Sequence, residues 1–224
     1  MYLSRFDINP ARRGAQKLLG SPQAMHAAVL AGFPPVDIPG ERRSRVLWRV
    51  DTGPVHTRLY VTSDVRPDLT HLVEQAGWPT THTWDTRPYG DLLDSLQVGG
   101  VWGFRLTANP TRSVKKVEGG RGQRVGHVTA AQQLAWLVDR SPRLGFSVTP
   151  DGTEPSVRVS ARQTRQFRRQ ADKVTLVVAQ YDGILTVTDV ELLRTALVGG
   201  IGPAKAYGCG LLTLAPVAPQ PAVS

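Results

Sequence analysis

Cysteine is almost absent from this sequence, since Cys209 is the only one among 224 residues. A single thiol excludes an intrachain disulfide and a zinc site built from cysteines. The five histidines follow neither an HxxxH nor an HExxH spacing, so they form no helical metal motif. We therefore expect neither a metal nor any other cofactor.

Long apolar runs are also missing, because none approaches the roughly 18 residues that a membrane-spanning helix requires. The opening residues, MYLSRFDINP, lack the basic-then-apolar pattern of a secretion signal. Together with the single cysteine, these absences favour the reducing cytoplasm and argue against a membrane protein.

Acidic residues are few compared with basic ones. The chain has 27 Lys and Arg but 18 Asp and Glu, which gives a net charge of +9 and an isoelectric point of about 10.3. Such an excess suggests a polyanionic partner, either nucleic acid or an anionic membrane surface. The apolar fraction of 41% is ordinary for a globular protein with a core.

The first half of the chain predicts the order β-α-β-β-α-β. Ser21-Pro22 is a typical helix start, because serine caps the helix and proline suits its first turn. Residues 10–20 are expected to form a basic loop. The expected elements are a strand over 2–9, a helix from 21, strands over 45–51 and 55–62, a helix over 67–76 and a strand over 101–109.

The second half predicts the same order again. The expected elements are a helix over 129–140, strands over 145–148, 157–162, 174–180 and 184–188, a helix opening at 188 and a strand over 211–215. Asp182-Gly183 predicts a hairpin turn. We therefore expect the α+β class with two tandem ferredoxin-like, RNA-recognition-like domains. Their predicted bounds are 1–115 and 116–216, followed by a disordered tail over 217–224.

A glycine loop precedes the last predicted strand, with paired glycines on both sides of a five-residue turn. The pairs are Gly200 with Gly202 and Gly208 with Gly210, and Lys205 lies between them. Glycines let a backbone approach another chain closely, and exposed N–H groups beside a lysine suit phosphates. Two pairs at this spacing favour a functional loop over a turn that only packs between helix and strand.

Two segments carry basic residues with almost no acid. Residues 155–171 contain five arginines and no carboxylate, and residues 105–126 contain six basic residues against Glu118 alone. Strand alternation would place Arg158 and Arg162 on one side, where they could follow a phosphate backbone. With one aromatic residue in the arginine segment, backbone contacts are expected rather than base stacking. The side chains expected to contact phosphates are Arg158, Arg162, Arg165, Arg168, Arg169, Lys115 and Lys116.

His26 is the histidine whose surroundings suggest catalysis. It lies one turn into the first predicted helix, after a segment that carries Arg12, Arg13 and Lys17. A lone helical histidine is usually structural. An imidazole that exchanges protons near neutral pH, placed beside cations, nevertheless suits phosphodiester transfer.

These features together resemble the CasE family of CRISPR repeat-RNA endoribonucleases, which belong to the type I-E Cascade system. The resemblance rests on the start MYLSRFDINPARRGAQKLLGSPQAMHAAVLAGFPP and on the loop GIGPAKAYGCGLL. It implies an enzyme that binds the repeat hairpin of precursor CRISPR RNA and cuts at its 3′ base without metal. The ribose 2′-OH would attack the adjacent phosphate, leaving a 2′,3′-cyclic phosphate and a 5′-OH.

The family motif assigns proton transfer to His26, as base or as acid. It also implies that the arginine strand binds the hairpin and that the product stays bound in Cascade with other subunits. Many relatives carry tyrosine three residues before the histidine, where this chain has Gln23. Gln23, Lys17, Arg12 and Arg13 are therefore candidate supporting residues, and the second proton-transfer group has no assignment.

Two other functions stay open. A repeat-associated RNA-binding scaffold subunit without catalysis would be consistent with the missing tyrosine. A ferredoxin-like protein that binds a small molecule would not need the excess of basic charge.

Overall fold

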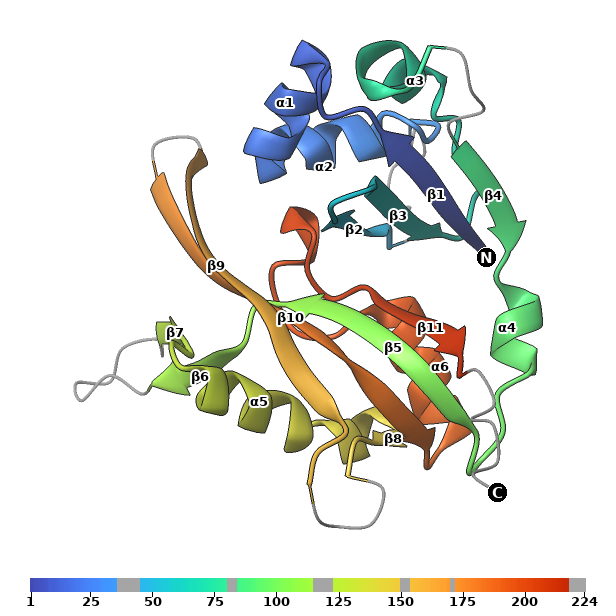
Figure 1. The fold of residues 1–224 in the computed structure, drawn as a ribbon, viewed down its shortest axis with the longest axis vertical. Coiled ribbons are helices and arrows are strands. Elements are labelled where there is room, and N and C mark those ends of the chain that lie inside the picture. Colours follow the sequence, from blue (N-terminus) through green and yellow to red (C-terminus); the bar gives the residue numbers. More distant parts are fainter. Residues whose placement is uncertain (36–44, 80–83, 115–122, 150–153, 170–171, 218–224) are drawn as a thin grey trace.

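The computed structural model describes residues 1–35, 45–79, 84–114, 123–149, 154–169 and 172–217. In this part of the chain two antiparallel sheets face each other, and helices cover their outer sides (Figure 1). The predicted α+β class is confirmed. In the same described ranges, no helix is long and apolar enough to cross a membrane.

The first sheet has the strand order β2-β3-β1-β4, with antiparallel neighbours throughout. Its strands are β1 (Tyr2–Ile8), β2 (Leu47–Thr52), β3 (Thr57–Ser63) and β4 (Trp84–Pro88). Counted along the chain, this is the 4-1-3-2 order of a ferredoxin-like unit. The sequence analysis missed β4.

Three helices cover the outer side of the first sheet, namely α1 (Arg13–Gly20), α2 (Pro22–Leu30) and α3 (Thr70–Ala76). Ser21 caps α2 as predicted, because its side chain accepts a hydrogen bond from the backbone N–H of Ala24. The basic loop predicted over 10–20 is wrong, because most of it forms α1. Ala15 and Leu18 are buried on one side of α1, which therefore packs as an amphipathic helix.

The second sheet has the strand order β11-β5-β10-β8, which again corresponds to 4-1-3-2. The strands on this path are β5 (Val101–Ala108), β8 (Phe146–Ser147), β10 (Asp172–Val187) and β11 (Leu212–Pro216), and a fifth strand, β9 (Val157–Arg169), pairs with β10. The strand predicted over 101–109 was expected to complete the first unit, and this is wrong, since β5 opens the second. The change of sheet lies within residues 89–100, ahead of the boundary expected at 115. Of the predicted tail, residues 218–224 lie outside the described residues.

Two helices, α5 (Ala130–Val138) and α6 (Val190–Gly199), cover the outer side of the second sheet, and the short α4 (Gly90–Asp94) joins the two units. The capping box predicted at Thr129 is confirmed, whereas Asp189 caps α6 instead of the predicted Thr188. Two short 3₁₀ helices, η1 (Ser141–Leu144) and η2 (Lys205–Tyr207), complete the helical part.

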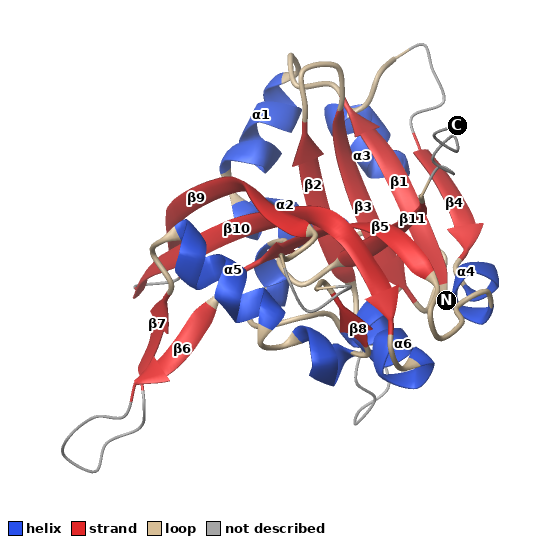
Figure 2. Cartoon of the chain, turned by 60° about the horizontal axis from the view of Figure 1, so that its bottom comes forward, coloured by secondary structure: helices blue, strands red, loops and turns tan. Residues whose placement is uncertain are grey.

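A long hairpin of β9 (Val157–Arg169) and β10 extends past the body of the second sheet, beside α1 and α2 (Figures 1 and 2). A separate small sheet, β6 (Thr111–Val114) with β7 (Gln123–Gly126), lies near the outer side of the second sheet. The turn predicted at Asp182-Gly183 is wrong, because β10 continues through it. A Cβ at Gly183 would lie 2.4 Å from the carbonyl oxygen of Ser156, so this glycine serves a close approach of neighbouring strands.

Candidate functional site

His26 lies on α2 and is half-buried. Its Nδ1 accepts a hydrogen bond of 3.3 Å from the indole N–H of Trp48 on β2. An indole N–H can only donate, so the neutral ring carries its proton on Nε2. Burial lowers the pKa of His26 below its ordinary value, because it disfavours the charged form.

A cleft of about 510 Å³ opens between the α1–α2 corner, β2 and the extended part of β9, and His26 itself is not among its lining residues. Trp48 lines this cleft and also contacts His26, so it connects the two. Of the predicted arginines whose side chains are described, only Arg165 lines the cleft, where Gln163 and Phe167 accompany it. The cleft therefore brings one cationic side chain of the β9 hairpin opposite the helix that carries His26.

The prediction that Arg158 and Arg162 project from one side of a strand is wrong. Val159 pairs with Tyr181 and Ala161 pairs with Gln180, so Ser160 is an extra residue in β9. This bulge reverses the alternation of side chains. Arg158 therefore shares a face with its partner Asp182, whereas Arg162 points to the opposite face and donates to the carbonyl oxygen of Val128 at 2.7 Å.

The structure does not describe the side chains of four further residues that were predicted to contact phosphates. Arg168 and Arg169 belong to β9, but their side chains are not described, and Lys115 and Lys116 lie outside the described residues.

The glycine loop packs between the two units. Gly200, Gly202, Gly208 and Gly210 all have positive φ, which favours glycine. A Cβ at Gly208 would lie 2.6 Å from the Trp48 ring, and one at Gly200 would lie 2.8 Å from Leu47. The glycines thus allow the loop to approach β2. This is a packing role, which the sequence favoured less than a functional loop.

Lys205, at the start of η2, is half-buried. Burial, with a smaller effect from the charge of Arg45, lowers its pKa. It therefore remains a candidate for a phosphate ligand, since an anion would restore the stability of its charged form.

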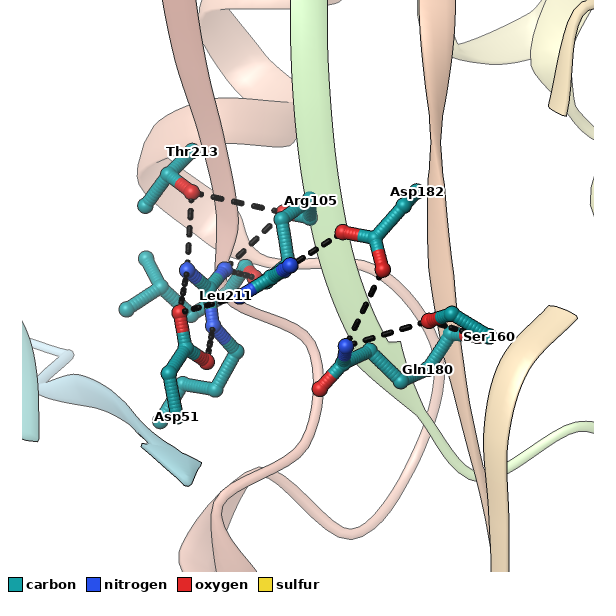
Figure 3. A network of polar contacts seen from close by, with 8 residues as sticks. Asp51, Arg105, Ser160, Gln180, Asp182, Leu211 and Thr213 are labelled. Carbon is teal, nitrogen blue, oxygen red and sulfur yellow. Dashed lines mark hydrogen bonds and ion pairs between the residues drawn. The ribbon is translucent and has the colours of Figure 1, made fainter. Parts of the chain in front are cut away.

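Sequence reasoning missed the contact that fixes the two sheets to each other. Arg49 of β2 is 2% exposed and points into the second sheet. It pairs with Asp51 at 2.6 Å, and it donates to the carbonyl oxygens of Arg105 and Leu211 and to the hydroxyl of Thr213. Figure 3 shows the network around it. The alternation in RVLWRVD was the available signal, because it places Arg49 and Asp51 on the face opposite Trp48.

The same network continues across the second sheet. Arg105 of β5 contacts Asp51 at 3.3 Å and Asp182 of β10 at 2.5 Å. Asp182 also accepts from Gln180, which donates to Ser160 at the bulge (Figure 3). A continuous set of polar contacts therefore links β2, the strand that carries Trp48, to the bulge in β9, the strand that carries the predicted arginines.

Comparison with known proteins places this architecture in a family. The sequence profile of the family described as CRISPR associated protein matches residues 1–216. The chain belongs to this family.

Two curated relatives and a solved structure agree with this membership. The CRISPR-associated endoribonuclease Cse3 of Thermus thermophilus is 31% identical over 224 residues, covering 96% of this chain and 100% of the relative. The Cascade subunit CasE of Escherichia coli is 34% identical over 129 residues, covering 54% of this chain and 61% of the relative. A structure of Thermus thermophilus Cse3 bound to an RNA representing a pre-cleavage complex has 29% identity and a TM-score of 0.78, covering 96% of this chain and 98% of that one. The resemblance to the CasE family is therefore confirmed.

The predicted supporting residues differ in their placement within this family fold. Arg12 donates to the carbonyl oxygens of Val73 and Gly77 at 3.2 and 3.1 Å, so it caps the end of α3 and does not face His26. Arg13, Lys17 and Gln23 are exposed. They are free to meet a ligand, and their role stays a prediction.

Proposed function

We propose that this chain is a metal-independent endoribonuclease that binds the repeat hairpin of precursor CRISPR RNA, cleaves it and stays bound as a Cascade subunit. The observation that carries the proposal is the half-buried, neutral His26, which Trp48 joins to a cleft that the β9 hairpin lines with Arg165. The full-length similarity to Cse3 supports it. The proposed compartment is the cytoplasm, where such transcripts are made.

The proposed reaction is a transesterification within the RNA. The 2′-oxygen of one ribose forms a bond to the adjacent phosphorus, and the bond from phosphorus to the 5′-oxygen of the next nucleotide breaks. A base takes the 2′-OH proton and an acid returns a proton to the 5′-oxygen. Cationic side chains and backbone N–H groups stabilise the charge on the phosphorane-like transition state.

His26 is the proposed base, because its lowered pKa keeps the ring neutral at pH 7. In the neutral ring only the lone pair of Nδ1 can accept a proton, and here it already accepts the hydrogen bond from the Trp48 N–H. The ring can accept a proton at Nδ1 once this bond opens, or at Nε2 after its proton has moved to Nδ1. The Trp48–His26 hydrogen bond must break in either case.

A labelled repeat hairpin incubated with the protein in EDTA tests the proposal. We expect one cut, with a product that ends in a 2′,3′-cyclic phosphate. Binding without any product would instead support the scaffold subunit, which Gln23 favours because an amide does not exchange protons.

Replacing Trp48 with phenylalanine tests the restraint on His26. Removing the indole N–H removes a bond worth about 0.5–1.5 kcal/mol that must break before catalysis. We therefore expect single-turnover cleavage up to about ten-fold faster, and ¹⁵N NMR shifts of His26 that no longer report a single tautomer.

Trp102→Phe is the matched control, since it removes a partly buried indole from the second unit, away from both cavities. It should leave the rate and the His26 shifts unchanged. A folded Trp48→Phe protein that cleaves more than ten-fold slower would show that the bond holds the ring productively.

The pH profile follows from the lowered pKa of His26. The neutral ring is the base, so the single-turnover cleavage rate should stay constant above the ordinary value of 6.5 and fall only at lower pH, where the ring becomes protonated. Single-turnover rates measured from pH 4.5 to 8.5 check this. A rate that instead declines as the pH rises through neutrality would assign His26 as the acid.

A further inference from the structure

A second basic cavity lies away from His26, on the outer side of the second unit. It has a volume of about 310 Å³, and Arg112 of β6, Arg124 of β7 and Arg140 after α5 line it together. We call it the arginine pocket. The remaining lining residues are Thr111, Ser113, Trp136, Gly202 and Pro203.

The arginine pocket holds three positive charges that no described carboxylate pairs with directly. Asp139, next to Arg140, favours the charged form of that arginine but forms no ion pair with it. These charges also act on a nearby histidine. Burial is the largest cause of the lowered pKa of His127, and the charges of Arg112 and Arg140 lower it further. Guanidinium groups that converge on one cavity without acids are suited to phosphate oxygens.

The three arginines are not equally free. Arg140 stacks on Trp136 at 4.6 Å and donates to its carbonyl oxygen, so it is held in place. Arg112 and Arg124 are exposed. Their backbones pair within the small sheet of β6 and β7, whereas their side chains form no ion pair with a described residue. A structural role therefore explains Arg140 in part, but it does not explain the other two.

The glycine loop connects this pocket to the cleft beside His26. Gly208, at one end of the loop, lines the cleft, and Gly202, near the other end, lines the arginine pocket. A nucleic-acid strand that leaves the cleft along the loop would reach the arginines without crossing a carboxylate of the loop, which has none.

We propose that the arginine pocket binds backbone phosphates of single-stranded RNA next to the hairpin, after this strand has crossed the glycine loop. The inference rests on the proposed function, and it assigns Arg112, Arg124 and Arg140 to binding the flanking strand. Recognition there is by charge, because the pocket offers one largely buried aromatic ring and no array for base stacking.

The test compares three RNAs whose scissile nucleotide is 2′-deoxy, so that none can be cleaved. One is the hairpin alone, and the other two carry about eight additional nucleotides, one on the 5′ side and one on the 3′ side. We expect the wild-type protein to bind one extended RNA roughly ten-fold tighter than the hairpin, with a steeper salt dependence. Arg112→Ala/Arg124→Ala should lose this gain and keep the affinity for the hairpin.

Arg5→Ala/Arg87→Ala is the matched control, because it removes two exposed arginines from the first sheet and the same net charge. It should keep the gain. Equal losses in both double variants, or a gain that survives Arg112→Ala/Arg124→Ala, would overturn the inference. Failure of the proposed function would look different, since the wild-type protein would then leave a hairpin with an intact scissile 2′-OH uncut, whichever of these RNAs it binds.

Discussion

Replacing His26 with alanine is expected to lower single-turnover cleavage by about 10²–10⁴-fold, which is the usual contribution of a positioned acid or base. RNA affinity should change little, because the ring is neutral and offers no charge to a phosphate. The measurement uses excess protein with labelled hairpin, so that binding and cleavage are followed separately.

His26→Gln separates proton transfer from packing. A glutamine carbonyl can accept the Trp48 hydrogen bond that Nδ1 accepts now, but it cannot exchange a proton. We expect the same loss as with alanine. His71→Gln is the control, since His71 is another half-buried histidine, bound to the carbonyl oxygen of Ala28 at 2.8 Å. Cleavage that persists in His26→Ala would remove His26 from the mechanism.

Features encoded by neighbouring residues could be predicted from the sequence. The caps at Ser21 and Thr129 each act within three residues, so local sequence is sufficient to place the starts of α2 and α5. Alternating polarity likewise predicted β2 and β3. These local signals supplied most elements of the doubled β-α-β-β-α-β order and the fold class, although β4 was missed and β5 was given to the first unit.

Features that depend on distant contacts could not be predicted. Asp182-Gly183 has the composition of a turn, but Asp182 pairs with Arg105, 77 residues away, and the strand continues. The bulge at Ser160 depends on how β9 meets β10, and it moved Arg162 to the face opposite Arg158. Tertiary pairing therefore decided where the predicted cations point.

The same division holds within the site. The sequence led to His26 through its helix and its basic surroundings, but nothing local indicated Trp48, which lies 22 residues away on another element. Arg12 was a candidate through proximity in sequence alone, and the structure places it on the end of α3. A site assembled from several elements is visible in the sequence only through the residue that carries its chemistry.

Replacing Arg49 with methionine is expected to have the largest effect on stability. The substitution leaves the buried carbonyl oxygen of Leu211 without its Arg49 donor and Asp51 without its closest partner. Removing one member of a buried pair typically costs about 3–5 kcal/mol. Urea unfolding followed by tryptophan fluorescence measures the change in the free energy of unfolding.

Arg58→Met is the matched control on the same sheet. Arg58 pairs with Asp7 at 2.8 Å, but both side chains are about one-third exposed, so the expected loss is about 0–1 kcal/mol. Arg49→Lys should lie between the two, because lysine keeps the charge but cannot reach all acceptors of the planar guanidinium. Since β2 also carries Trp48, a loosened sheet contact should separate the His26 helix from the β9 hairpin and slow cleavage even where the protein remains folded. Equal stability of Arg49→Met and Arg58→Met would show that the two sheets are held together by the glycine loop instead.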